Sequence, residues 1–115
     1  MKNKLVIVTG ASTGIGKACA LEFAKNGANL VLAARSVEKL DTVSTEISLL
    51  GVEVLCVPTD VSKQEDCRLL MEKSLEKFGK IDVLVNNAGI SMRAAFADLD
   101  LEVLKKVMDV NFWGT

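Results

Sequence analysis

The chain contains 115 residues, so we expect residues 1–115 to form a single domain. The 14 Lys and Arg residues nearly cancel the 15 Asp and Glu residues, and this balance argues against binding to nucleic acid or to an anionic membrane surface. The sequence has no histidine and no apolar run of bilayer-spanning length, so we expect neither a metal site nor a membrane segment, and we assign the chain to the cytoplasm.

Four short apolar runs divide the sequence into comparable segments. They lie at residues 5–8, 30–34, 52–57 and 81–85. Nearly continuous apolar runs of this length are typical of strands that are buried on both faces of a parallel sheet. We therefore expect four parallel strands.

Segments with helical spacing of apolar residues lie between these runs and after the last one. The start and stop signals of the first three are Gly27, the N-cap Ser36, Gly51, the capping box Ser62–Glu65, and Gly79. A fourth helix is expected from near Asp100, with Leu104, Val107, Met108 and Phe112 on one face. The three cysteines fall on apolar strands or helix faces without metal-binding spacing, so we expect reduced, buried thiols.

The alternation of strands and helices predicts an α/β fold. Right-handed crossovers then produce a doubly wound parallel sheet, Rossmann-like, with helices on both faces. If the strands are numbered along the chain, we expect the order 3-2-1-4 and a ligand crevice beside strands 1 and 4. The fourth strand would then be an unprotected apolar edge, so we interpret the chain as an amino-terminal part that is truncated before the later strands.

A glycine-rich segment lies between the first strand and the first helix. It reads Thr9-Gly10-Ala11-Ser12-Thr13-Gly14-Ile15-Gly16. Glycines in this pattern allow a sharp turn and let a phosphate approach the helix amino terminus, where free N–H groups and the helix dipole favour anions. A purely structural turn is the alternative, but the strand–turn–helix context favours phosphate binding.

Three motifs together resemble the signatures of the short-chain dehydrogenases/reductases. The glycine loop has the spacing of that family's first signature. The segment Asn86-Asn87-Ala88-Gly89 after the fourth strand is similar to its second signature, and Asp60 after the third strand is similar to another. All three occur in the family's order, and the resemblance covers essentially the whole chain. It implies a dinucleotide-binding oxidoreductase.

The resemblance also implies which residues contact the cofactor. The pyrophosphate and the nearby ribose would lie against the glycine loop, at Gly10, Ser12, Thr13, Gly14, Ile15 and Gly16. Asp60 would bind the adenine amino group, and Val61 would supply a backbone contact. The nicotinamide-side ribose would lie beside Asn87, Ala88 and Gly89. Without the glycine loop, Asp60 would be read as a loop residue and the asparagine motif as a polar turn.

The end of the second strand indicates which dinucleotide is bound. NAD-binding folds generally carry Asp or Glu there to hold the ribose hydroxyls. Here Ala34 takes that place and Arg35 follows it, and a guanidinium suits a ribose 2′-phosphate by charge and by geometry. A solvated arginine that opens a helix is the alternative interpretation. We predict NADP as the cofactor in preference to NAD.

Asn111 interrupts the apolar stripe of the expected fourth helix, so its amide needs hydrogen-bond partners. A helix-kink hydrogen bond would explain it structurally. The family resemblance instead implies the supporting Asn of a catalytic Asn-Ser-Tyr-Lys set. The family's Ser and Tyr-x-x-x-Lys lie downstream of this point, and the 115 residues include no tyrosine. We therefore predict that they are inactive alone.

Two functions remain open. The first is an NADP-dependent short-chain dehydrogenase/reductase, of which this chain is a fragment. It would transfer hydride between nicotinamide and a small carbonyl or alcohol substrate, and its full-length form would be a homo-oligomer. The second is a non-catalytic dinucleotide-binding or interaction module. The unprotected fourth strand favours the first. A Rossmann-like methyltransferase is disfavoured because its glycine loop does not require the motif at residues 86–89.

Overall fold

This computed structural model describes residues 2–12, 14–60, 62–86 and 109–112. Strands and helices alternate through most of that part of the chain. The elements are β1 (Leu5–Thr9), α1 (Gly14–Lys25), β2 (Asn29–Ala34), α2 (Val37–Ser48), β3 (Val54–Pro58), α3 (Gln64–Phe78), β4 (Val83–Asn86) and β5 (Asp109–Phe112). The first four strands and the first three helices are those predicted from the apolar pattern.

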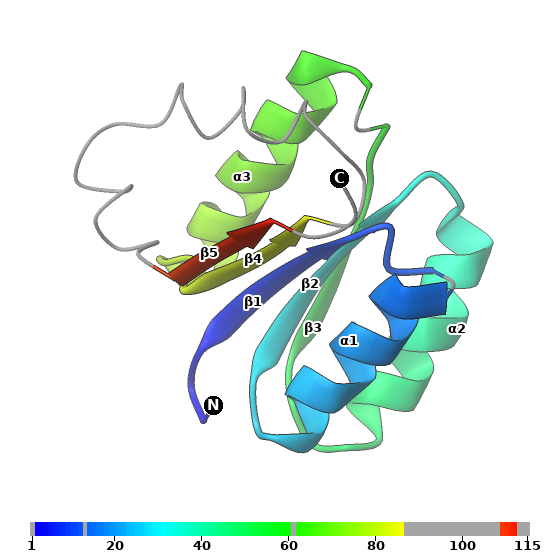
Figure 1. The fold of residues 1–115 in the computed structure, drawn as a ribbon, viewed down its shortest axis with the longest axis vertical. Coiled ribbons are helices and arrows are strands. Elements are labelled where there is room, and N and C mark those ends of the chain that lie inside the picture. Colours follow the sequence, from blue (N-terminus) through cyan, green and yellow to red (C-terminus); the bar gives the residue numbers. More distant parts are fainter. Residues whose placement is uncertain (1, 13, 61, 87–108, 113–115) are drawn as a thin grey trace.

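The strands form one parallel sheet in the order β3-β2-β1-β4-β5 (Figure 1). β1 lies in the middle, where Leu5 is opposite Asn29 of β2 and Val6 is opposite Val83 of β4. Figure 1 shows α1 and α2 on one face of the sheet and α3 on the other. The predicted order 3-2-1-4 and the doubly wound, Rossmann-like fold are therefore confirmed.

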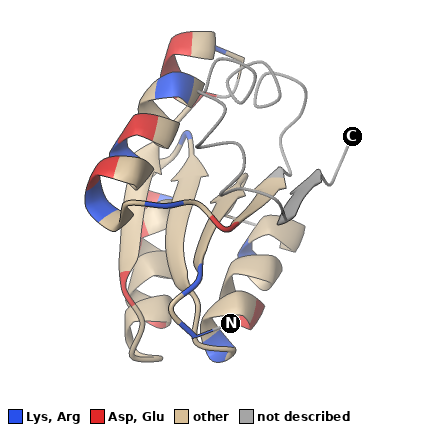
Figure 2. Cartoon of the chain, turned by 90° about the vertical axis from the view of Figure 1, so that its left-hand side faces the viewer, with Lys and Arg blue, Asp and Glu red and all other residues tan. Residues whose placement is uncertain are grey.

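Each face of the sheet packs its own hydrophobic core. Leu5 and Ile7 of β1 belong to the core under α3, whereas Val6 and Val8 belong to the core under α1 and α2. Strands β1 to β4 contain no charged residue, and in Figure 2 the blue and red segments lie on helices and connections while the strands are tan. Burial on both faces explains why these strands are continuous apolar runs in the sequence.

The carboxyl end of the described chain differs from the prediction. Residues Asp109–Phe112 form β5, which pairs with β4 so that Asn111 lies opposite Val85, where we expected the end of a helix. β4 is therefore an interior strand and not an open edge. Helical spacing is a local signal, whereas strand pairing satisfies the peptide groups along β4 through contacts that are distant in sequence. The rest of the expected helix, residues 100–108, lies outside the described residues.

The predicted helix start is right for α2 and wrong for α3. The Ser36 hydroxyl oxygen caps α2 and accepts a hydrogen bond from the Lys39 N–H at 3.3 Å. The residue before α3 is Lys63, which makes no side-chain capping bond. Ser62 does not form the expected capping box, because its hydroxyl donates to the Asp60 carboxylate at 2.6 Å. A charged acceptor two residues away makes the stronger hydrogen bond.

The three cysteines are free thiols, with Cys67 buried and with Cys19 and Cys56 partly exposed. Burial raises the pKa of the Cys56 and Cys67 thiols, so both stay protonated at neutral pH. In residues 2–12, 14–60, 62–86 and 109–112, no cluster of acidic, Cys or His side chains could hold a metal ion. A search of the same residues finds no helix with the length and hydropathy needed to cross a membrane.

Candidate functional site

The carboxyl ends of the strands meet at one edge of the sheet, and hydrogen bonds fix the loops that leave it. The Thr9 hydroxyl donates to the Val85 carbonyl at 3.4 Å and so ties β1 to β4. The Thr59 N–H, just after β3, donates to the Ala34 carbonyl at 2.9 Å. The Ala11 N–H, just after β1, donates to β2 at 3.2 Å. The connections after β1, β2 and β3 therefore begin close together.

The glycine loop folds back against the first turn of α1. Gly10 and Gly14 have positive φ angles of 62° and 59°, which side-chain-bearing residues rarely adopt. Gly16 is buried, and a Cβ atom placed on it would overlap the Gly10 carbonyl oxygen and lie 2.7 Å from the Gly10 carbonyl carbon. The loop backbone therefore contacts the helix directly at Gly16, and only glycine allows that approach.

The amino terminus of α1 is open to an anion. Its first turn contains no acidic residue, so no carboxylate of that turn neutralises the positive end of the helix dipole. Ile15 is 68% exposed there. Lys17, the lysine nearest the loop in sequence, makes an ion pair with Glu46 of α2 at 3.6 Å. The positive charge at this end of the helix thus comes from its own N–H groups.

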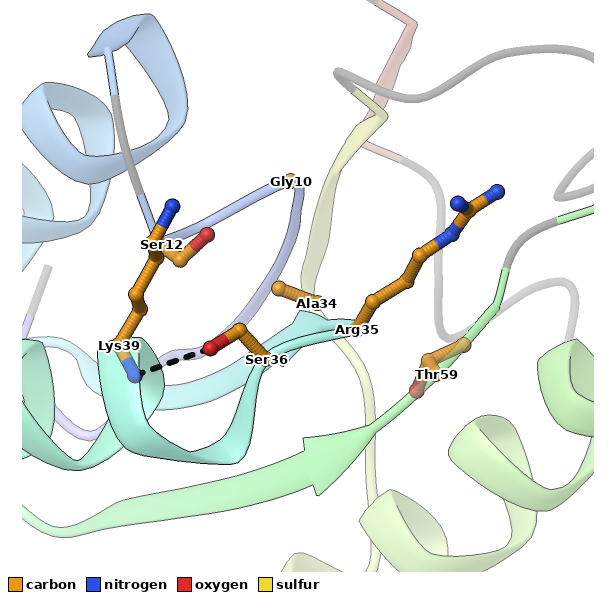
Figure 3. A pocket seen from close by; sticks show the side chains of 7 residues that line it. All are labelled: Gly10, Ser12, Ala34, Arg35, Ser36, Lys39 and Thr59. Atoms are coloured by element: carbon orange, nitrogen blue, oxygen red, sulfur yellow. Dashed lines mark hydrogen bonds between the residues drawn. The ribbon is translucent and has the colours of Figure 1, made fainter.

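A pocket of about 320 Å³ opens beside the glycine loop (Figure 3). It is lined by Gly10, Ser12, Ala34, Arg35, Ser36, Lys39 and Thr59. The structure thus brings together three residues that the sequence analysis assigned to the cofactor, namely Gly10, Ser12 and Arg35. Two lining side chains are cationic and none is a carboxylate, so the pocket suits an anionic ligand.

Sequence reasoning missed three of the residues that line this pocket, namely Ser36, which it predicted only as an N-cap, Lys39 and Thr59. Lys39 lies three residues after the N-cap Ser36, in the first turn of a helix that starts at the site. Thr59 lies between the end of β3 and Asp60. Their positions next to predicted elements were the available signal. The pocket itself could not be predicted because its residues come from three separate connections.

Asp60 and Arg35 contact each other across the mouth of the site. An Arg35 Nη atom lies 3.5 Å from the Asp60 carboxylate, with the arginine side chain 76% exposed. The same carboxylate oxygen accepts hydrogen bonds from the Ser62 hydroxyl and from its N–H at 2.6 and 3.0 Å. These two bonds, with a smaller contribution from Arg35, lower the pKa of the Asp60 carboxyl. Asp60 is therefore a fixed carboxylate acceptor at neutral pH.

Other predicted site residues lie outside the described residues, namely Thr13, Val61, Asn87, Ala88 and Gly89. Asn111 is placed by its backbone in β5. Its predicted position on a helix is therefore wrong. The described part of the predicted site consists of the glycine loop, Arg35 and Asp60.

A comparison with known families decides where this arrangement belongs. The family model described as short chain dehydrogenase matches residues 4–115, which is nearly the whole chain. The chain belongs to the short-chain dehydrogenase family. The match includes all three motifs on which the sequence resemblance rests.

Relatives of this short-chain dehydrogenase have been described in several organisms. It is 46% identical to 11-beta-hydroxysteroid dehydrogenase A of Sesamum indicum over 113 residues, which cover 96% of this chain and 32% of that protein. It is 44% identical to an uncharacterized oxidoreductase of Listeria monocytogenes, covering 99% of this chain and 46% of the relative. The chain thus spans between about a third and a half of the length of these curated relatives.

A solved structure reproduces the fold closely. An alcohol dehydrogenase from the archaeon Thermococcus sibiricus, complexed with 5-hydroxy-NADP, superposes with a TM-score of 0.84 at 33% identity. The match covers 95% of this chain and 57% of that one. The chain therefore shares its fold with an alcohol dehydrogenase whose structure contains 5-hydroxy-NADP.

Proposed function

We propose that this chain binds NADP(H) along the glycine loop and in the pocket at the end of β2, as the cofactor-binding region of an oxidoreductase. The proposed reaction is hydride transfer between nicotinamide and a small carbonyl or alcohol substrate. The observation that carries the proposal is the pair Ala34 and Arg35, which supply a guanidinium and no carboxylate to the pocket.

The glycine loop fits the pyrophosphate of a dinucleotide. Gly16 leaves no side chain between α1 and the loop, and the first turn of the helix has no competing acid. Free N–H groups at such a helix end bind phosphate without a dedicated cationic side chain. The Thermococcus sibiricus relative, whose structure contains 5-hydroxy-NADP, supports a nicotinamide dinucleotide as the ligand.

Arg35 supports NADP over NAD. The methyl group of Ala34 cannot hold the ribose hydroxyls that a carboxylate would bind at the end of this strand. The Arg35 side chain is exposed and can turn toward a phosphate without breaking buried contacts. Its contact with the Asp60 carboxylate is long, at 3.5 Å. Exposed ion pairs of this kind contribute only about 0–1 kcal/mol to stability, so a ribose phosphate can replace that carboxylate as the partner of Arg35.

When bound, the nicotinamide ring would supply or accept the hydride. The glycine loop would hold the pyrophosphate, and the pocket would orient the adenosine end. The reaction also needs a positioned acid or base that moves a proton at the substrate oxygen. Residues 1–115 contain no tyrosine and no histidine for this step, so we expect them to bind cofactor without turnover when they are isolated. In this proposal Asn111 would support the proton transfer, together with the Ser, Tyr and Lys of the family's catalytic set.

A second candidate is a dinucleotide-binding module without catalysis, because β5 pairs with β4 and so removes the open strand edge that favoured the enzyme over the module. A longer protein, in which residues 1–115 are joined to the regions that only the longer relatives contain, distinguishes the enzyme from the module. The absorbance of NADPH is followed in the presence of ketone or aldehyde substrates. NADPH oxidation that appears only when those regions are present supports the enzyme. Binding without turnover in that longer protein supports the module.

Cofactor titration tests the central assignment. We expect NADPH to bind more tightly than NADH, and Arg35→Ala to weaken NADPH binding about 10–100-fold with little change for NADH. Ala34→Asp introduces the missing carboxylate and should shift the preference toward NADH. Equal affinity of the unmodified protein for the two cofactors would contradict the proposal.

The proposal further places the whole protein in the cytoplasm as a homo-oligomer. Three free cysteines suit a reducing compartment, since disulfides are the norm in oxidising ones. Fluorescence microscopy of the tagged protein tests the location, and light scattering of the purified protein tests the oligomeric state.

A further inference from the structure

Lys39 is a second cationic side chain at the pocket, and it approaches from a different side than Arg35. Figure 3 shows its ammonium group extending toward Ser12 of the glycine loop, whereas Arg35 extends away from that loop. The two side chains therefore flank the stretch between Ala34 and Ser36 at the end of β2. A phosphate in the pocket would meet one cation from each side.

The start of α2 fixes where Lys39 stands. The Ser36 hydroxyl oxygen accepts the Lys39 N–H, which anchors the backbone of Lys39 to the residue next to Arg35. Because side chains on a helix tilt toward its amino terminus, a lysine in the first turn extends back toward the pocket and not along the helix. The backbone thus directs this cation at the site.

The charges around the pocket leave Lys39 available for a ligand. Lys17 is held by Glu46 at 3.6 Å, and Arg35 is held by Asp60 at 3.5 Å. Within the described part of the chain, no carboxylate forms a salt bridge with Lys39. Of these three cations, Lys39 is therefore the one that makes no salt bridge with an acid of the described ranges.

We propose that Lys39 binds the ribose phosphate of NADP from the side of the glycine loop, opposite Arg35, and so helps to determine cofactor specificity. This inference rests on the proposed function, since it names a second specificity residue for the same ligand. Arg35 must leave Asp60 to reach the phosphate, whereas Lys39 needs no such exchange. The ammonium is a flexible point charge, which can adjust to a phosphate that Arg35 contacts with its planar fork.

Binding measurements on the purified protein test this role. Lys39→Met removes the charge and keeps an unbranched side chain, and we expect it to weaken NADPH binding about tenfold while NADH binding changes by less than about twofold. Lys39→Arg keeps the charge and should retain the preference for NADPH. Lys73→Met, on the exposed face of α3 at the opposite side of the sheet, is the matched control and should change neither affinity.

The outcomes separate this inference from the proposed function. If Arg35→Ala loses NADPH affinity and Lys39→Met does not, the role of Lys39 is wrong while the proposed function stands. If Lys39→Met weakens NADPH and NADH equally, the lysine binds the shared pyrophosphate and the specificity role is also wrong. If the unmodified protein binds neither dinucleotide, both proposals fail. Circular dichroism of each variant shows that the comparison is made between folded proteins.

Discussion

The amino termini of α1 and α3 lie at the same edge of the sheet but differ in the charged side chains of their first turns. The first turn of α3 carries Glu65 and Asp66, and the Asp66 carboxylate also accepts the Asp60 N–H at 2.9 Å. The first turn of α1 carries no acid and is approached by the glycine loop at Gly16. The start of α3 thus carries acidic side chains that repel an anionic ligand, whereas the first turn of α1 carries none.

The comparison shows that helix geometry alone does not make an anion site. Both helices start after a parallel strand, and the first N–H groups of any α-helix have no partner within the helix itself. The sequence decides which of them is used, because glycines allow close approach in one case and acids occupy the position in the other. The hydrophobic core under α3 therefore contributes to stability, whereas the candidate site lies at the amino-terminal ends of α1 and α2.

The largest expected effect on stability is on the α3 face. Leu70 is fully buried there, and Leu70→Ala should lower the free energy of unfolding by about 2–5 kcal/mol, as measured by urea denaturation. Leu69 is 48% exposed beside it, so Leu69→Ala should cost less than about 0.5 kcal/mol. Loss of NADPH affinity in folded Leu70→Ala protein would contradict the separation of the two regions.

Gly16→Ala should remove cofactor binding by breaking the contact between loop and helix. Its Cβ would overlap the Gly10 carbonyl, so the loop must shift, at a cost in stability of about 1–3 kcal/mol. Gly79→Ala is the matched control at the carboxyl end of α3, where φ is 75° and a Cβ meets nothing within 4 Å. It should cost about 1–2 kcal/mol through backbone strain and leave the NADPH Kd unchanged. Wild-type affinity of folded Gly16→Ala would show that the close approach is unnecessary.

The sequence predicted those parts of the site that depend on local chemistry. The strand–loop–helix context of Gly10 to Gly16 and the position of Arg35 after β2 follow from short-range patterns, and the structure agrees with both. The predictions that were wrong concern residues whose structure depends on contacts distant in sequence or on a competing hydrogen-bond partner. Asp109–Phe112 joined β4 as a strand, and Ser62 bonded to Asp60 and not to the start of α3.

The smallest expected effect concerns Asp60. Hydrogen bonds from Ser62 lower the pKa of its carboxyl, so its contribution to stability is fully present above the ordinary pKa of an aspartate. That contribution is lost as the pH falls through the lowered value in the folded state. Asp60→Asn should remove this acid-side dependence from urea denaturation measured at several pH values. An unchanged pH profile in that variant would show that the hydrogen bonds from Ser62 do not favour the carboxylate.

Backbone amide chemical shifts during a titration with NADPH test the comparison between α1 and α3 most directly. The account predicts that the signals of Ser12, Ile15 and Gly16 move most, because their N–H groups lie in the loop and in the open helix end. The signals of Glu65 and Asp66 at the start of α3 should stay nearly unchanged, because the acidic side chains of that first turn repel an anionic ligand. Largest shifts at the start of α3, with the glycine loop unaffected, would contradict the account.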